Sequence, residues 1–161
     1  MILTKNIDSI FLDRDGVINI DEGYTHKWSE FVFIDGVLEA LKKLSDLDKN
    51  LIIVTNQSGI ARGYYTEQDY LQLEKMMLYT MKNFGIKILN VYHCPHHIDG
   101  SIASLSIACS FRKPSPGMFL RYEIGEHDIM IGDNASDMQA ACSAGVKHRW
   151  LVSDKSSGPY T

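Results

Sequence analysis

Residues 10–16 read Ile-Phe-Leu-Asp-Arg-Asp-Gly, an apolar run that stops abruptly at charged residues. Residues 51–59 repeat the pattern as Leu-Ile-Ile-Val-Thr-Asn-Gln-Ser-Gly, and residues 129–134 repeat it as Ile-Met-Ile-Gly-Asp-Asn. Short continuous apolar runs that end in polar turn residues are typical of strands buried on both faces of a parallel sheet. Weaker candidates for further strands are residues 88–92 and 150–152. The pattern therefore predicts a parallel sheet whose strands give way to polar loops.

Apolar residues that recur every three or four positions predict helices between these strands. The longest helix begins with a capping-box pair, Thr66 and Asp69, and ends at Gly85. The helix before it is expected to have its N-cap at Asp35. The predicted helices cover residues 37–47, 66–84, 115–119 and 138–144. Strands and helices alternate along the chain, which favours an α/β fold with an open parallel sheet covered by helices on both faces.

The composition is that of a globular protein. The 161 residues are 45% hydrophobic and 22% charged, which predicts one domain over residues 1–161. The formal net charge of −4 disfavours a nucleic-acid partner, because such partners select a strongly basic surface. No apolar run approaches the about 20 residues of a membrane span, and the N-terminus lacks a signal-peptide pattern, so a cytoplasmic monomer without a membrane partner is expected. The three widely spaced cysteines fit reduced thiols or a metal site better than disulfides.

Three polar residues from distant segments are expected to meet at one edge of the sheet. Asp13, Thr55 and Asp133 each lie where an apolar strand ends, and ligands of such sheets bind at the carboxyl ends of the strands. Two connections, residues 16–34 and 92–113, are longer than ordinary loops. Long loops at this edge commonly serve as binding loops or lids. The sequence thus predicts a functional site at the carboxyl edge.

A hard divalent cation is predicted at this edge. Asp13 and Asp15 alternate in an extended segment, so their carboxylates leave the backbone on the same side and repel each other unless a cation lies between them. Asp133 adds a third oxygen donor. A few carboxylates without histidine, completed by water and a substrate phosphate, are typical of Mg²⁺ sites.

The neighbouring polar residues suit a phosphate group. Thr55, Asn56, Gln57 and Ser58 offer hydrogen-bond donors to an anion, and Lys113 supplies a positive charge.

A glycine-rich phosphate loop with Gly-Lys-Ser/Thr is absent from the sequence, so a carboxylate has to act as the catalyst. We expect Asp13 to attack phosphorus and form an aspartyl phosphate, and Asp15 to act as general acid and then as general base. Lys113 and the cation then offset charge on the transferring group.

Four ordered segments carry a resemblance to a known family. They read Phe-Leu-Asp-Arg-Asp-Gly-Val-Ile-Asn at residues 11–19, Val-Thr-Asn-Gln-Ser-Gly-Ile-Ala-Arg-Gly at residues 54–63, Arg-Lys-Pro-Ser-Pro-Gly-Met at residues 112–118 and Gly-Asp-Asn-Ala-Ser-Asp-Met at residues 132–138. Together they resemble the signature segments of the haloacid dehalogenase superfamily, and specifically its branch of heptose-bisphosphate and histidinol-phosphate phosphatases. The resemblance covers about residues 10–144.

The resemblance implies a Rossmann-like three-layer sandwich without a large cap domain. It also implies Asp13 as nucleophile, Asp15 as proton donor, Thr55 and Lys113 as phosphoryl-stabilising residues, and Asp133 as a Mg²⁺ ligand. Asn134 follows this aspartate where close relatives often have lysine; it is included among the Mg²⁺ ligands, with contact to the substrate or to neither as the alternatives. The substrate contacts implied by position are Asp21, Glu22, Gly23, Tyr24, Thr55, Asn56, Gln57, Ser58, Arg112 and Lys113.

The second long loop resembles a zinc-binding loop of the same branch, which uses Cys-x-His and Cys-x-Cys. The resemblance implies Zn²⁺ ligands at Cys94, His96 and Cys109, whereas Phe111 occupies the position of the fourth ligand. Structural zinc needs four donors, so His93, His97 or water would have to complete the site.

The resemblance leaves the substrate open within the branch. It favours hydrolysis of the 7-phosphate of D-glycero-D-manno-heptose 1,7-bisphosphate, in the synthesis of nucleotide-activated heptose for surface glycans such as the lipopolysaccharide core. Histidinol phosphate is the alternative substrate, because the motifs do not separate the two activities. An alternative of another class is a non-catalytic metal-binding module whose site has decayed, as Phe111 would suggest.

Overall fold

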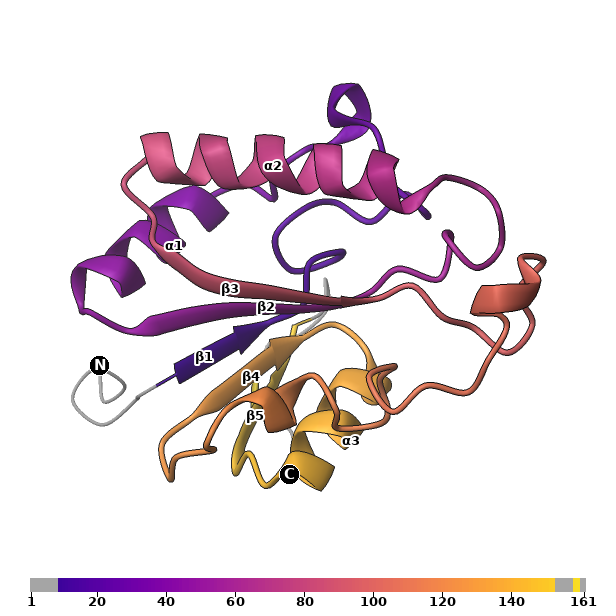
Figure 1. Ribbon diagram of the computed structural model, residues 1–161. Helices are drawn as coiled ribbons and strands as arrows, with labels where there is room; N and C mark the ends of the chain where they lie inside the picture. Colours follow the sequence, from indigo (N-terminus) through magenta and orange to yellow (C-terminus); the bar gives the residue numbers. More distant parts are fainter. Residues whose placement is uncertain (1–8, 153–157, 160–161) are drawn as a thin grey trace.

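The computed structural model describes residues 9–152 and 158–159. These residues form a six-stranded sheet with the strand order β3-β2-β1-β4-β5-β6 (Figure 1). The strands are β1 (Ser9–Leu12), β2 (Asn50–Asn56), β3 (Ile88–Cys94), β4 (Ile129–Gly132), β5 (His148–Leu151) and β6 (Gly158–Pro159). The first five strands are parallel, as predicted, and the two-residue β6 pairs with β5 in the antiparallel direction.

Helices cover both faces of the sheet and complete three layers. They are the α-helices α1 (Val37–Asp46), α2 (Glu67–Asn83) and α3 (Ala135–Ala144), and the 3₁₀ helices η1 (Trp28–Glu30), η2 (Ala103–Leu105) and η3 (Phe119–Arg121). Helices α1 and α2 lie above the sheet in Figure 1, and α3 lies below it. The predicted Rossmann-like α/β architecture is confirmed, and no large cap domain is inserted within residues 9–152. Over the same residues, no helix has the length and apolar character that a membrane span requires.

Two apolar cores explain why the strands read as continuous hydrophobic runs. Ile10 and Leu12 of β1 point into the core under α1 and α2, whereas Phe11 between them points into the core under α3 and η3. Strand β2 alternates in the same way, with Ile53 on the first face and Ile52 on the second. A strand covered on both faces has no solvent side, so consecutive positions are apolar, as in residues 10–12 and 51–54.

Helix termini follow the sequence in most places. Thr66 caps α2, and Asp69 returns the bond to the Thr66 backbone, so the predicted capping box is present. Gly145 ends α3 in the left-handed conformation, with φ of 95°. The N-cap expected at Asp35 is wrong, because Gly36 occupies the cap position with φ of 77° and no side chain caps the helix.

The helix predicted at residues 115–119 is only a 3₁₀ turn, η3. Phe119 and Leu120 donate to the Pro116 carbonyl at 2.9 and 3.2 Å, so Pro116 does begin the turn. Tyr122 then adopts an extended backbone, with φ of −122° and ψ of 153°, and the helix cannot continue. The ring of Phe119 lies 5.0 Å from the ring of Phe11, so this short turn is held by the core rather than by helical hydrogen bonds.

Two neighbouring methionines of α2 test how this helix packs on the core beneath α1 and α2. We expect Met77→Ala to lower the free energy of unfolding by about 2–5 kcal/mol, because Met77 is fully buried and its removal leaves a cavity. Met76 is exposed on the same helix, so Met76→Ala is the matched control and should change stability by about 0.5 kcal/mol or less. Urea unfolding of both variants measures the difference, and equal losses would contradict the packing.

Candidate active site

The carboxyl ends of the central strands form the floor of the site. Asp13 follows β1, Thr55 lies near the end of β2 and Asp133 follows β4, as predicted. The Asp13 backbone N–H donates to the Ile131 carbonyl at 3.0 Å, which fixes the start of the loop against β4. A cavity of about 230 Å³ opens beside them. Its lining residues are Asp13, Asp15, Asp21, Gly23, Tyr24, Asn56, Gln57, Ser58, Tyr65, Lys113, Asn134, Ser136 and Asp137.

Lys113 is buried at the centre of this floor. Its Nζ lies 2.9 Å from Asp13 Oδ1 and 2.6 Å from Asp137 Oδ1, and it donates to the Val54 carbonyl at 2.8 Å. The side chain of Asn56 holds the Lys113 backbone by donating to its carbonyl at 3.0 Å and accepting from its N–H at 3.1 Å. Burial alone would lower the pKa of Lys113, but the charges of Asp13 and Asp137 outweigh burial and raise it. Lys113 is therefore a fixed cation.

Three carboxylates crowd together beside this lysine. One oxygen from each of Asp13, Asp133 and Asp137 lies within 4.8 Å of the others. Burial raises the pKa of Asp13 to about 7, against the opposing charge of Lys113. Burial and the charge of Asp137 likewise raise the pKa of Asp133. A hard cation would relieve this repulsion, and an all-oxygen donor set of this kind fits Mg²⁺.

The side chain of Asp15 lies outside the carboxylate group, although the sequence predicts it as a metal ligand. After Asp13 the backbone turns around the Arg14 carbonyl, which accepts from the N–H groups of residues 17–19. Both aspartates line the cavity, but Asp15 is not among the carboxylates whose oxygens lie within 4.8 Å of one another, because its oxygens are held by other partners. Asp15 Oδ1 accepts from Arg14 and Asn19, and Asp15 Oδ2 accepts from Arg14 and Gln57.

The predicted phosphate-binding residues after β2 form a connected network. Gln57 Nε2 donates to Thr55 Oγ1 at 2.9 Å and to Asp15 Oδ2 at 3.0 Å. Tyr65 OH donates to Gln57 Oε1 at 2.7 Å, which fixes the orientation of the amide. Thr55 is buried beneath this network and does not line the cavity.

The remaining predicted substrate contacts lie at different depths. Asp21, Gly23 and Tyr24 line the cavity from the first long loop, whereas Glu22 is exposed and does not. Arg112 does not line the cavity either, and its Nη1 lies 3.5 Å from the His96 carbonyl. Asn134 lines the cavity, with its Nδ2 3.4 Å from Asp133 Oδ1.

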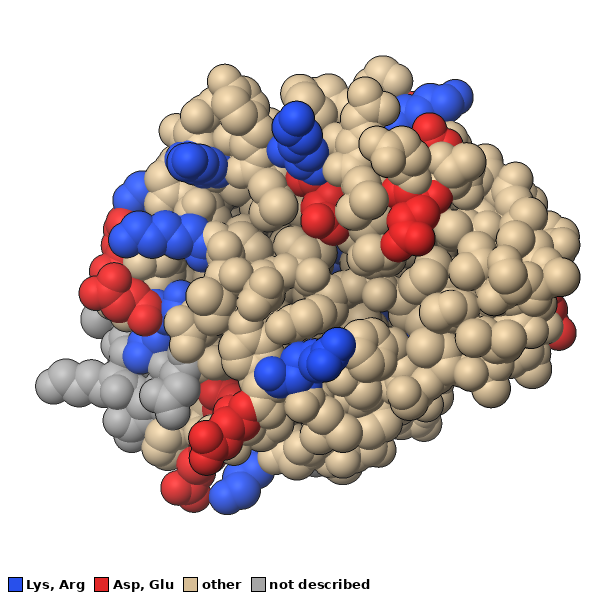
Figure 2. Space-filling model, in the orientation of Figure 1, with Lys and Arg blue, Asp and Glu red and all other residues tan. Residues whose placement is uncertain are grey.

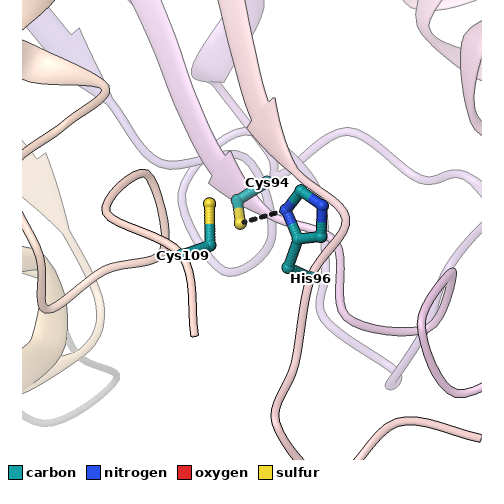
Figure 3. Close-up of side chains that lie close together, drawn as sticks. All are labelled: Cys94, His96 and Cys109. Carbon is teal, nitrogen blue, oxygen red and sulfur yellow. Dashed lines mark hydrogen bonds between the residues drawn. The ribbon is translucent and has the colours of Figure 1, made fainter. Parts of the chain in front are cut away.

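The cysteine cluster lies at the end of β3. Figure 3 shows Cys94, His96 and Cys109 with their ligand atoms gathered together, and these atoms lie within 4.8 Å of one another. Cys94 Sγ is 3.8 Å from His96 Nδ1. Three donors of the kinds that bind zinc are thus in place.

No fourth donor joins the cluster among the described residues. His93 Nε2 pairs with Glu67 at 2.8 Å, and His97 Nδ1 accepts from the Asp99 N–H at 3.0 Å, so both histidines are engaged elsewhere. Phe111 packs against the second core, with the Arg121 guanidinium 5.1 Å from its ring. The residues present fit three of the four positions of a structural zinc site.

Two functional residues carried no assigned role in the sequence. Asp137 falls one helical turn after Asp133, which is the spacing that brings both to the N-terminal end of a helix following a strand. Arg14 lies inside the first motif, between the two aspartates, but its burial and its contacts depend on distant residues and have no local signal.

Comparisons with known proteins agree with this geometry. The model of the polynucleotide kinase 3 phosphatase family matches residues 7–148. The chain is 44% identical over 156 residues to the D-glycero-beta-D-manno-heptose-1,7-bisphosphate 7-phosphatase of Yersinia pestis, covering 93% of this chain and 82% of that protein. It is 44% identical over 159 residues to the enzyme of the same name from Pasteurella multocida, covering 95% and 84%.

A solved structure is also similar. The D,D-heptose 1,7-bisphosphate phosphatase of B. bronchiseptica, complexed with magnesium and phosphate, has a TM-score of 0.79 and 32% identity, covering 90% of this chain and 80% of that chain. These matches place the protein among the phosphoric monoester hydrolases, the class to which the fold and the site point. Within that class, the chain belongs to the haloacid dehalogenase superfamily, in its branch of heptose-bisphosphate and histidinol-phosphate phosphatases. The alternative of a non-catalytic module is therefore wrong.

The close approach of Gly16 to Asp133 gives a test of the carboxylate group. A Cβ added at Gly16 would collide with the Asp133 carboxylate, and the φ of 84° would add strain. We expect Gly16→Ala to lower phosphate release about a hundredfold, because displacing a catalytic group by about 1 Å costs that much. Gly36 has a φ of 77° but no heavy atom within 4 Å of an added Cβ. Gly36→Ala is the matched control for strain and should retain the wild-type rate, and equal activities would contradict the geometry.

Proposed function

We propose that the protein is a Mg²⁺-dependent phosphatase that removes the 7-phosphate of D-glycero-D-manno-heptose 1,7-bisphosphate through an aspartyl-phosphate intermediate. The contact of 2.9 Å between Lys113 Nζ and Asp13 Oδ1, beside two further carboxylates, is the observation that supports it most directly. The names of the relatives support the substrate, and the magnesium complex of the similar structure supports the metal.

In the first chemical step, Asp13 attacks the phosphorus atom. Its Oδ1 already accepts from the Arg14 N–H at 2.8 Å and from Lys113, so Oδ2 is the oxygen left to attack. As the bond from Asp13 forms, the bond between phosphorus and the sugar oxygen breaks, and Asp15, which has to be protonated when this step begins, gives that oxygen its proton. Lys113 offsets the negative charge on the phosphoryl oxygens.

In the second step, water replaces the aspartate. Asp15, now ionised, takes a proton from a water molecule that attacks phosphorus, and the bond to Asp13 breaks to release inorganic phosphate. Mg²⁺ held by Asp13, Asp133 and Asp137 would supply further charge neutralisation during both steps. The residues that hold the phosphoryl group therefore serve both halves of the reaction.

The cavity suits a small polar substrate. Its lining residues are mostly polar, and charged side chains of both signs are among them. Arg112 lies outside the cavity lining, and its side chain contacts the backbone carbonyl of His96. We assign Arg112 to the end of the substrate away from the reacting phosphate, where a second phosphate would lie.

A polynucleotide substrate, which the name of the matching family model suggests, is disfavoured by charge. The net charge is −4, and on the face in Figure 2 the lysines and arginines lie scattered among acidic side chains. Binding to nucleic acid is driven by clustered positive charge.

The setting of the reaction belongs to the same proposal. We assign residues 1–161 to one domain that acts as a monomer in the cytoplasm and supplies heptose for nucleotide activation and surface glycans. The three cysteines are free thiols, which suits a reducing compartment.

Steady-state kinetics test the substrate and the nucleophile together. We expect kcat/KM to be higher for heptose 1,7-bisphosphate than for histidinol phosphate. Activity should stop in a chelator and return with Mg²⁺. The variant Asp13→Asn should be inactive, because an amide is a poor nucleophile. Asp46→Asn, at an exposed helix position, is the matched control and should keep full activity. A preference for histidinol phosphate would overturn the substrate, and turnover by Asp13→Asn would overturn the nucleophile.

We also propose that the cysteine cluster binds zinc through three protein ligands, more weakly than a four-ligand site. Metal analysis of protein purified without chelator should find zinc that a competing chelator removes readily. Phe111→Cys should slow that removal, since it restores a thiolate, whereas Cys142→Ser changes an exposed thiol outside the cluster and should leave the zinc unchanged. Zinc content near zero in both the wild type and Phe111→Cys would contradict the proposal.

A further inference from the structure

Arg14 is a charged side chain in an almost fully buried position. Only 1% of it is exposed. Its Nη2 donates to Asp15 Oδ1 at 2.8 Å and to the Thr25 carbonyl at 2.9 Å, and its Nε lies 3.2 Å from Asp15 Oδ1. Its Nη1 is buried without a hydrogen-bond partner among the described residues. The guanidinium is thus directed chiefly at one carboxylate.

Aromatic rings enclose the remaining surface of this guanidinium. The centroids of Phe31 and Tyr70 lie 6.0 and 5.8 Å from the Arg14 Cζ atom. Such rings attract a cation weakly. A buried ion pair with an unpaired donor is a poor source of stability, because desolvation offsets the attraction. The arrangement is better explained by what it does to Asp15.

Donors on several sides hold the Asp15 carboxylate in one orientation. Besides Arg14, Asn19 Nδ2 donates to Oδ1 at 3.0 Å and Gln57 Nε2 donates to Oδ2 at 3.0 Å. The side chain of Asp15 remains 22% exposed and lines the cavity. Its accessible surface therefore faces the space where a substrate oxygen would lie.

We propose that Arg14 is a positioning residue that aims Asp15 at the leaving-group oxygen and keeps it out of the carboxylate group of Asp13, Asp133 and Asp137. This inference rests on the proposed role of Asp15 as proton donor. Without the guanidinium, Asp15 loses its bidentate partner and keeps only the single bonds from Asn19 and Gln57, so it can turn more easily toward a cation bound by the neighbouring carboxylates. The proton donor would then be misplaced while the nucleophile and the phosphate-binding residues remain.

Leaving-group dependence distinguishes this role from a structural one. A sugar oxygen needs a proton to depart, whereas the nitrophenolate of p-nitrophenyl phosphate departs without one. We therefore expect Arg14→Met to lower turnover of heptose bisphosphate about a hundredfold more than turnover of p-nitrophenyl phosphate, because general acid catalysis contributes that much or more. Arg14→Lys keeps a cation that can reach Asp15. Its ratio of heptose-bisphosphate turnover to p-nitrophenyl phosphate turnover should therefore lie between the ratios of Arg14→Met and the wild type.

Two further variants make the result decisive. Asp15→Ala should show the same selective loss, and if it does not, the proposed role of Asp15 is wrong. If Asp15→Ala shows the loss but Arg14→Met and Arg14→Lys slow both substrates equally, the positioning role of Arg14 is wrong. Should Arg14→Met not fold, the ratio in Arg14→Lys decides alone, with a wild-type ratio contradicting the proposal.

A matched control tests whether the loss of any buried polar contact, and not specifically that of Arg14, changes the ratio of the two substrates. Asp128 is also buried and accepts from the backbone N–H groups of Ser9 and Gly125, at the opposite end of β1 and β4. Asp128→Asn should destabilise the protein but leave the ratio of the two substrates unchanged. A selective loss in this variant too would show that destabilisation alone produces the effect. If the wild type does not hydrolyse heptose bisphosphate, the substrate proposal fails, and histidinol phosphate serves as the alkyl substrate.

Discussion

The ion pairs of Lys113 hold the site together. The lysine reaches the sheet from a long loop and meets Asp13 after β1 and Asp137 in α3, all three of them buried. Separating any one of these charges would leave the others uncompensated in a place largely shielded from water, which is costly. The same burial makes the charges effective toward a phosphoryl group. For stability, these three charges must remain paired with one another. For catalysis, they must be available to a phosphoryl group. A bound cation and phosphate would meet both requirements.

Local patterns are sufficient for most of the fold. The strand in residues 10–12 is recognisable because helices cover both of its faces, so each position is apolar. The start of α2 is recognisable because Thr66 and Asp69 are only three positions apart, and the side chain of each accepts a hydrogen bond from the backbone N–H of the other. The start of α1 is not, since Gly36 takes the cap position through a left-handed backbone and Asp35 only precedes it. The prediction fails here because Asp35 and Gly36 can both serve as the N-cap. The backbone conformation of the segment before the helix decides between them.

The site was predictable in position but only partly in detail. Strand ends determine where Asp13 and Asp133 lie, and parallel pairing brings them together. The direction of Asp15 depends instead on a turn after β1 and on a buried arginine held by the backbone of Thr25 and by aromatic rings from other segments. Alternation along the chain is compatible with both aspartates lining the cavity, but it does not reveal the partners that keep Asp15 away from the other carboxylates. Such orientations arise from tertiary packing, which single-sequence patterns do not contain.

Lys113 lies on the same connection as His96 and Cys109 of the cysteine cluster, yet the two are anchored differently. Lys113 is fixed by Asn56, by its ion pairs and by the Val54 carbonyl, none of which belongs to the cluster. The side chain of Arg112, the preceding residue, makes one hydrogen bond among the described residues, a long one of 3.5 Å to the His96 carbonyl. Loss of a fourth zinc ligand at Phe111 would thus loosen Arg112 far more than Lys113. If the cluster binds zinc and Arg112 binds the substrate as proposed, a weaker metal site would affect the distant part of the substrate, while Asp13 and Lys113 would stay in place.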